Sequence, residues 1–215
     1  MTTACLLCLA AMGLFLQPAP ASADEKEWQP WTLASAETEI AADTPLLAEI
    51  GYRFRDETSG SDQYLLRVNV DTAIDSAVRI GGGAAHFRTG DQAEWRGFER
   101  VTLIHKGWMS RTQFEQRFFE GADRAELRLR ERVQYTQSID NRTRVFAAGE
   151  WLVRVQSRRH GGDTGTDQLR AQLGVTRDLG GGYSASLAYL LLHQNVAGAE
   201  DRLAHIPQLT VLRRF

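Results

Sequence analysis

Apolar and polar residues alternate along most of this 215-residue chain, in short segments separated by turn-forming residues. The clearest segment covers residues 46–55, where Leu46, Ile50 and Phe54 lie on one face and Glu49 and Arg53 on the other. Successive side chains of a β-strand point to opposite faces of its sheet, so this period of two predicts a strand with one apolar and one polar face. The turn residues 58–62 and a second alternating segment at 64–71 complete a predicted hairpin.

The same alternation continues to the C-terminus and predicts an all-β chain. No window shows a sustained helical period; residues 122–136 have a charged surface helix as an alternative, but their apolar side chains are spaced by two. Single-chain bacterial barrels have an even number of strands, so we expect an antiparallel up-and-down transmembrane β-barrel of about 10–12 strands, with twelve preferred. The eleven segments found are 28–40, 46–55, 64–71, 76–88, 94–105, 110–119, 124–136, 143–155, 167–178, 183–194 and a last one from about 205.

The last segment ends the chain on an aromatic residue, Phe215. Leu209 and Val211 alternate with polar Thr210, although Arg213 stands where an apolar residue is usual. This ending is similar to the closing strand of bacterial outer-membrane barrels, whose terminal Phe is read by the barrel-assembly machinery. The similarity implies a cell outer-membrane location, with outer-membrane lipid, the assembly machinery and periplasmic chaperones as partners.

The N-terminal segment has the features of a cleaved secretory signal peptide. Residues 5–16 are apolar throughout, and the small-x-small sequence 21–23 precedes Asp24. The apolar segment is too short for a spanning helix, which needs roughly 20 residues; a buried first helix is the alternative. We therefore expect residues 1–23 to be removed and 24–215 to form a single barrel domain. Both cysteines, Cys5 and Cys8, lie in the removed part, so disulfides and thiolate chemistry are not expected.

The polar face of the predicted strands is rich in arginine and glutamate. In a barrel these side chains converge on the lumen, where guanidinium and carboxylate groups pair bidentately. A structural network that fills the lumen is the preferred interpretation, and a constricted channel that attracts anions or selects solutes is the second. The predicted lumenal residues are Glu49, Arg53, Arg55, Arg67, Glu115, Arg117, Glu126, Arg128, Arg130, Arg132, Glu150, Arg154 and Arg170.

Several short motifs on these strands resemble a bacterial family known as domain of unknown function 2490, whose members are expected to be outer-membrane barrels. The resemblance implies architecture and location, and it implies no catalytic residue. The motifs are an early Trp (Trp28 or Trp31), Glu99-Arg100, the Arg-x-x-x-Glu-x-Arg strand from Arg111 to Arg117, the Arg-x-Arg-x-Arg strand from Arg128 to Arg132, Glu150-Trp151, Arg170 and Tyr189.

No pattern for catalysis or for binding a metal or cofactor is found. The five histidines, His86, His105, His160, His193 and His205, have no metal-ligand spacing. Ser186 and His193 have opposite parity on one strand, so a barrel-wall lipid hydrolase is only the third hypothesis. The net charge of −2 argues against a nucleic-acid-binding protein. Aromatic residues near strand ends suit interfacial girdles, with buried core aromatics as the alternative: Trp28, Trp31, Trp95, Trp108, Trp151 and Tyr183.

We therefore predict a passive role, as a small pore or as a structural or accessory envelope protein, and no enzymatic activity. The leading alternative is a soluble periplasmic barrel of lipocalin type that holds a ligand. The two differ in which face points inward. A soluble barrel buries its apolar face in the lumen, whereas a transmembrane barrel turns that face to lipid.

Overall fold

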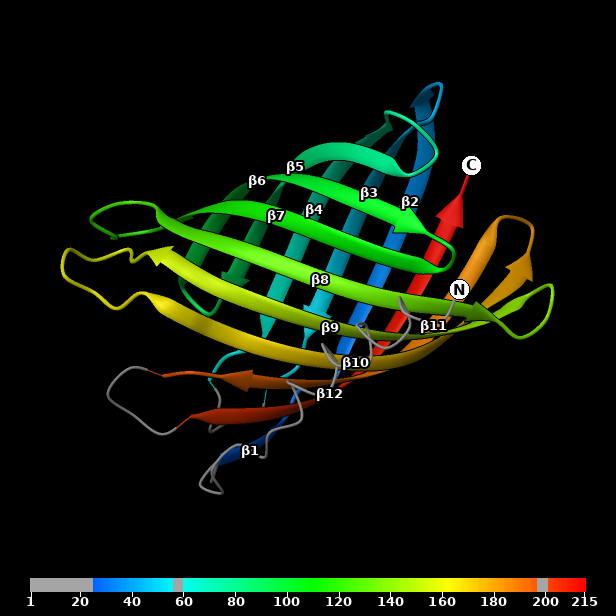
Figure 1. Ribbon diagram of the computed structural model, residues 1–215. Coiled ribbons are helices and arrows are strands. Elements are labelled where there is room, and N and C mark those ends of the chain that lie inside the picture. The colour runs from blue at the N-terminus through cyan, green and yellow to red at the C-terminus, as the bar shows by residue number, and fades with distance from the viewer. Residues whose placement is uncertain (1–24, 56–59, 197–200) are drawn as a thin grey trace, which may run out of the picture.

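A computed structural model describes residues 25–55, 60–196 and 201–215, which form one β-sheet wrapped into a barrel (Figure 1). Among the described residues, no helix is long and apolar enough to cross a membrane. The predicted signal peptide, residues 1–23, lies outside the described residues. The strands are β1 (Glu25–Trp28), β2 (Trp31–Ala41), β3 (Thr44–Arg53), β4 (Gln63–Ala73), β5 (Val78–Thr89), β6 (Gln92–His105), β7 (Trp108–Phe119), β8 (Glu126–Ser138), β9 (Thr143–Gln156), β10 (Gly165–Gly180), β11 (Tyr183–Gln194) and β12 (Arg202–Arg214).

The barrel closes through a parallel pair. Each strand from β2 to β12 is antiparallel to the next in sequence, and β12 then pairs with β2 in parallel, as the neighbouring red and blue strands of Figure 1 show. Strand β1 pairs with β12 in the same register, because Trp28 lies opposite His205 and Trp31 opposite Gln208. Strands β1 and β2 therefore form one interrupted strand, and eleven strands surround the lumen.

The predicted all-β barrel is confirmed. The number of strands around the lumen is odd, however, where an even number was expected. The twelfth strand is the short β1, which continues the line of β2 beyond an interruption at Gln29 and Pro30. Pro30 has no N–H to give to a neighbouring strand. Its carbonyl instead accepts a hydrogen bond from the Phe54 N–H at 2.9 Å. With an odd number of strands in an up-and-down barrel, the first and last strands run in the same direction, so the pair that closes the barrel is parallel.

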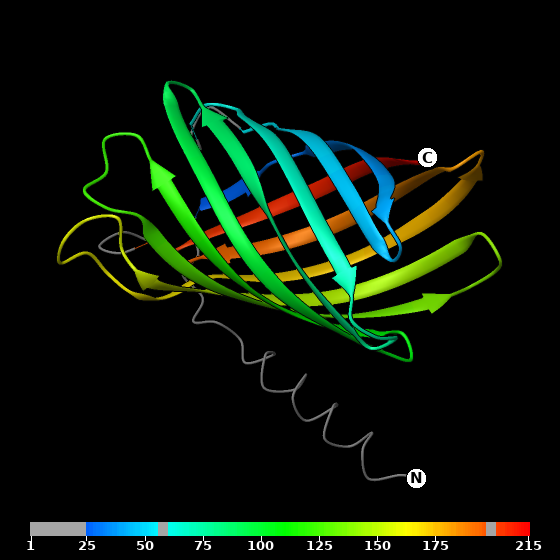
Figure 2. The same ribbon diagram turned by 90° about the horizontal axis from the view of Figure 1, so that it is seen from above.

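Most tight turns lie at one end of the barrel and the longer connections start at the other, and Figure 2 shows the two ends pointing in opposite directions. The tight end includes residues 42–43, 106–107 and 181–182; the connections that follow β3, β7, β9 and β11 start at the other end, which also has the two-residue turn 90–91. In the tight 139–142 turn, the backbone N–H groups of Arg142 and Thr143 donate to Asp140 and hold the pKa of that carboxyl below its ordinary value. Outer-membrane barrels have short periplasmic turns and longer external loops. On that pattern, the end with the longer connections, residues 157–164 among them, corresponds to the external end.

The outer surface of the barrel is mostly apolar, with Glu99 on β6 and Glu131 on β8 as charged exceptions, and most of the charged side chains point inward. Ile50, Leu173 and Leu187 are among the most exposed apolar side chains, and they lie on the outer face. On the adjacent positions of the same strands, Glu49, Gln172 and Ser186 line the lumen. A soluble barrel has the reverse arrangement, so the geometry favours a barrel whose outer face meets lipid.

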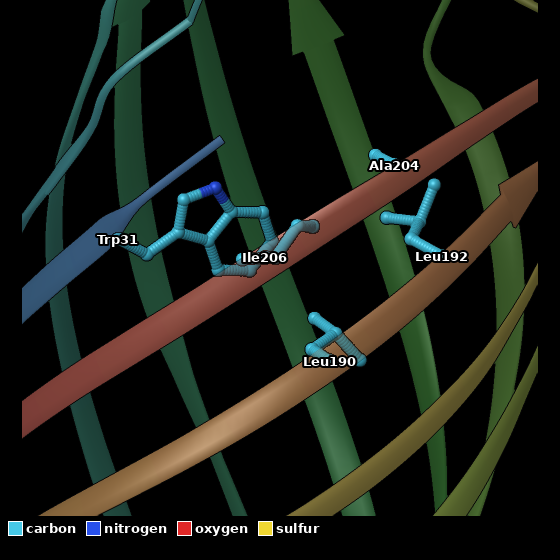
Figure 3. Close-up of a cluster of buried hydrophobic side chains, with 5 residues drawn as sticks. All are labelled: Trp31, Leu190, Leu192, Ala204 and Ile206. Atoms are coloured by element: carbon cyan, nitrogen blue, oxygen red, sulfur yellow. The ribbon is translucent and has the colours of Figure 1, made fainter. Parts of the chain in front are cut away.

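One predicted girdle residue points the other way. Trp31 is buried inside the barrel, where it forms an apolar cluster with Leu190, Leu192, Ala204 and Ile206 (Figure 3). Trp28, by contrast, is exposed. The two tryptophans are three residues apart on one interrupted strand, so a period of two places them on opposite faces. The prediction that both belong to a girdle was therefore wrong for Trp31.

The glycine tract of β5 allows a lumenal aromatic ring to lie against the backbone. A Cβ atom at Gly83 would overlap the Val68 carbonyl oxygen, and it would lie 2.8 Å from the Phe98 Cζ atom and 3.0 Å from the Asn69 Cα atom. Phe98 itself is buried. The glycine thus permits a close approach of both backbone and ring, while β5 continues through the tract.

We expect Gly83→Val to destabilise the barrel by about 1–3 kcal/mol, because the added side chain overpacks against the Val68 carbonyl oxygen and the Phe98 ring. Urea unfolding of the refolded barrel, followed by tryptophan fluorescence, measures this change. Gly149→Val is the matched control: it is also a strand glycine, but beyond its two chain neighbours no residue comes within 4 Å of the position that a Cβ atom would occupy there. Equal losses for the two variants would show that the close contacts at Gly83 do not constrain β5.

Candidate functional site: an arginine-rich lumen

The predicted charged residues surround a cavity of about 440 Å³ inside the barrel. Eleven of the thirteen line the cavity directly. The other two, Glu126 and Arg154, lie beside it and pair with each other at 3.3 Å. The terminal Phe215 lies at the tight-turn end, where its N–H donates to the Glu37 carbonyl at 3.0 Å.

The most deeply buried charge in the lumen is Glu115 on β7, which is 1% exposed. One of its carboxylate oxygens accepts both the Nε–H and an Nη–H of Arg128, at 2.9 and 2.6 Å. The other accepts from Arg130 at 3.0 Å and from the Gln113 amide at 2.7 Å. Such bidentate, charge-assisted contacts are what a buried carboxylate needs to remain ionised.

Glu150 on β9 forms a second centre a short distance along the same wall. It accepts from Arg130 at 2.7 Å and from Arg170 at 2.9 Å, and a guanidinium nitrogen of Arg132 lies 4.0 Å away. Arg130 therefore bridges Glu115 and Glu150. These two carboxylates tie β7, β8, β9 and β10 together through side chains as well as through the sheet.

The pairs join into one continuous network over the strands from β6 to β10. Arg117 bridges Glu94 and Glu126, and Arg154 bridges Glu126 and Asp167. Arg128 then links Asp167, at 3.1 Å, to Glu115. In order, the network runs Glu94, Arg117, Glu126, Arg154, Asp167, Arg128, Glu115, Arg130, Glu150 and Arg170.

The opposite wall has fewer carboxylates and more aromatic surface. The guanidinium carbon of Arg53 lies 3.9 Å from the centre of the Trp31 ring and 5.3 Å from that of Phe87, and Arg53 donates to Gln63 at 2.8 Å. Its buried Nε has no hydrogen-bond partner among the described residues. Arg67 pairs with Glu49 at 3.0 Å. Arginine on this wall is thus stabilised largely by aromatic faces.

Sequence reasoning missed several members of the lumen. Arg96, Arg100 and Arg111 share the inward parity of predicted residues on their strands or next to them, so the same alternation could have identified them. Glu94 follows the same rule on β6, and Asp71 on β4 pairs with Arg100. Asp167 could not be found this way, because its parity on β10 matches the outward Leu169.

The described part of the lumen carries an excess of positive charge. Among the side chains that line the cavity or belong to the ion pairs described above, twelve arginines face seven carboxylates, a formal excess of five, although the whole chain carries −2. Positive charge has therefore been concentrated inside the barrel. The arginines are 53, 55, 67, 96, 100, 111, 117, 128, 130, 132, 154 and 170, and the carboxylates are those of residues 49, 71, 94, 115, 126, 150 and 167.

The structure also shows where the metal-ligand and hydrolase candidates of the sequence lie. Within the described residues, no group of three or more His, Cys, Asp or Glu side chains is arranged to hold a metal ion. The Ser186 hydroxyl lies on the lumenal side and hydrogen-bonds the Thr176 hydroxyl at 2.7 Å. The His193 ring lies 3.4 Å from the Asp201 carboxylate instead.

A closed barrel with an apolar outer face and a charged lumen defines a porin-like outer-membrane β-barrel. One solved structure has the same barrel fold. The chain superposes on the NanC porin with a TM-score of 0.56 at 9% sequence identity, covering 82% of this chain and 93% of that one. It also matches the KdgM porin, in complex with disordered oligogalacturonate, with a TM-score of 0.49 at 10% identity, covering 74% of this chain and 81% of that one.

Sequence comparison identifies the family. Residues 28–203 match the family described as "Protein of unknown function (DUF2490)", and the chain belongs to that family, as its motifs indicated. It is also 25% identical, over 222 aligned positions, to the uncharacterized protein MexAM1_META1p0181 of Methylorubrum extorquens. That alignment covers 97% of this chain and 95% of the relative.

Proposed function

We propose that this protein is a passive outer-membrane channel that favours small anionic solutes. The observation that carries the proposal is the excess of five arginines over carboxylates in the described lumen. Charged side chains lining a narrow passage set its ion selectivity. A low-dielectric wall around them concentrates ions of the opposite sign.

A purely structural filling does not account for this excess. Buried ion pairs stabilise a wall only when each charge is compensated, and an uncompensated buried charge is costly. A lumen filled for stability alone would therefore approach neutrality, as the network from Glu94 to Glu150 largely does. The additional arginines, Arg53 and Arg111 among them, reduce stability and are best explained by contact with anions.

The size of the cavity sets the size of the solute. A volume of about 440 Å³ holds on the order of ten water molecules, or one small organic ion, at roughly 30 Å³ per water. A channel of this size passes single small solutes rather than folded or branched polymers.

Reversal potentials in planar lipid bilayers test the proposal. With the purified barrel in a potassium chloride gradient, we expect chloride to be favoured over potassium by about tenfold at low salt. The preference should decrease toward 1 M salt, because the Debye length falls to about 3 Å there. A folded barrel that conducts no ions, or one that favours potassium, contradicts the proposal.

A further inference from the structure

Arg111 on β7 differs from the arginines around it. Its side chain is half-buried and lines the lumenal cavity. Among the described residues it has neither a hydrogen bond nor an ion pair, whereas Arg100 pairs with Asp71 and Arg130 with Glu115 and Glu150. All five guanidinium N–H donors of Arg111 therefore remain available to the cavity.

The charges nearest to Arg111 are mostly of the same sign. Arg132 lies directly opposite on the neighbouring strand β8, and like charges in that position repel. The guanidinium groups of Arg130, Arg100 and Arg132 all act on Arg111 repulsively, and Glu150 is the attractive group among its main electrostatic partners. This arrangement is unfavourable for the barrel alone. An anion between the guanidinium groups would turn their net repulsion into a net attraction.

We propose that Arg111, together with Arg132, forms an oxyanion-binding site in the lumen. The planar guanidinium fork matches the two oxygens of a carboxylate or phosphate group and gives two parallel hydrogen bonds. Arg132 contributes from the same face: it already donates to Gln134 and Gln172 at 2.8 Å, which fixes its side chain beside Arg111. A spherical anion such as chloride gains the charge interaction without the bidentate geometry.

This inference deepens the proposed function, because it names the chemical group that the channel would select. It predicts that the oxyanion group of a solute rests at Arg111 during passage. The site is therefore expected to bind inorganic phosphate or acetate more tightly than chloride, whether or not the barrel conducts.

Thermal unfolding of the detergent-folded barrel tests the site without using conductance. The probes are sodium phosphate and sodium acetate, each compared with sodium chloride at equal ionic strength. We expect each oxyanion to raise the unfolding midpoint of the wild-type barrel by about 2–4 °C, since a ligand that binds only the folded state stabilises it. Arg111→Gln should lose this shift. Arg88→Gln, which changes an exposed arginine outside the cavity lining, should keep it.

Arg111→Gln should fold, because it removes one of several repelling charges. Arg111→Lys gives a second comparison: it keeps the charge but loses the planar fork, so its oxyanion shift should be smaller than that of the wild type. A general salt effect on protein surfaces acts on every variant alike. Equal shifts in wild type, Arg111→Gln and Arg88→Gln would therefore overturn the site.

Block of chloride current separates the site from the channel. In planar bilayers, we expect phosphate to reduce the wild-type current, and Arg111→Gln to raise the half-blocking concentration by about tenfold, as the loss of a charge-assisted hydrogen bond implies. A barrel with the Arg111-dependent thermal shift but no conductance supports the site and contradicts the channel. An anion-selective channel with the same thermal shift in wild type and Arg111→Gln supports the channel and contradicts the site.

Discussion

Replacing Glu115 by leucine is expected to lower the free energy of unfolding by about 3–5 kcal/mol, the cost of leaving a buried ion pair without one partner. Glu115 is 1% exposed and accepts hydrogen bonds from Arg128, Arg130 and Gln113. Leucine fills much of the same volume but leaves the guanidinium of Arg128, itself 2% exposed, with Asp167 as its remaining carboxylate. Urea unfolding of the barrel in detergent measures the loss.

The comparison with Glu37→Leu separates the effect of burial from the effect of losing a negative charge. Glu37 pairs with Arg214 at 2.8 Å near the tight-turn end, where both side chains are much more exposed. Solvent-exposed pairs contribute about 0–1 kcal/mol, so this variant should stay close to the wild type. Glu115→Gln should fall between the two, because the amide keeps one acceptor oxygen but removes the negative charge. If Glu115→Leu costs no more than Glu37→Leu, the buried network does not stabilise the wall between β7 and β10.

Most of the strands could be predicted from the sequence because the membrane and the lumen impose the same period on every one of them. Lipid demands an apolar residue at each outward position, and the lumen tolerates a polar residue at each inward one. The predicted segment 183–194 coincides with β11 (Tyr183–Gln194), and residues 143–155, predicted from their alternation, differ from β9 (Thr143–Gln156) by one residue. Local pattern was sufficient wherever a strand is regular.

The closure of the barrel could not be predicted, because it depends on residues far apart in the chain. The pair Arg214 and Glu37 joins positions 177 residues apart, and nothing in the local sequence of β12 states whether its neighbour runs parallel or antiparallel. The predicted strand 28–40 corresponds to the end of β1 together with β2. Its interruption at Pro30 and its parallel pairing with β12 determine the number of strands around the barrel.

Asp167 shows why part of the lumen escaped prediction. Simple alternation along β10 places it outward with Leu169, yet it is buried and pairs with Arg128 and Arg154. The pairing of β10 with β9 shifts register between Thr166 and Gln168, so one extra residue enters the strand there. A β-bulge of this kind turns a side chain to the other face. Alternation therefore identified arginines on regular strands but not the carboxylate that two of them share.

The decisive test of the membrane assignment is an arginine on the outer face. Leu173 is 64% exposed, lies in the middle of β10, and has Ala147 and Tyr189 as its neighbours across the sheet. If this face meets the hydrocarbon core, Leu173→Arg should destabilise the barrel by about 2–4 kcal/mol in phospholipid vesicles. On a water-facing surface the same change stays within about 0.5 kcal/mol, because the residue makes few contacts to lose.

Leu179→Arg is the matched control on the same strand. Leu179 is 58% exposed, so the two leucines differ little in accessibility, but it lies next to the Gly180 end of β10. Near the interface an arginine costs about 0–1 kcal/mol, since its long side chain reaches the polar headgroups. A large loss at Leu173 with a small loss at Leu179 requires a depth-dependent environment, which only a bilayer supplies. Small losses at both positions would instead mean that the apolar outer face is in water, and the arginine-rich lumen would then have to be explained as the interior of a soluble barrel.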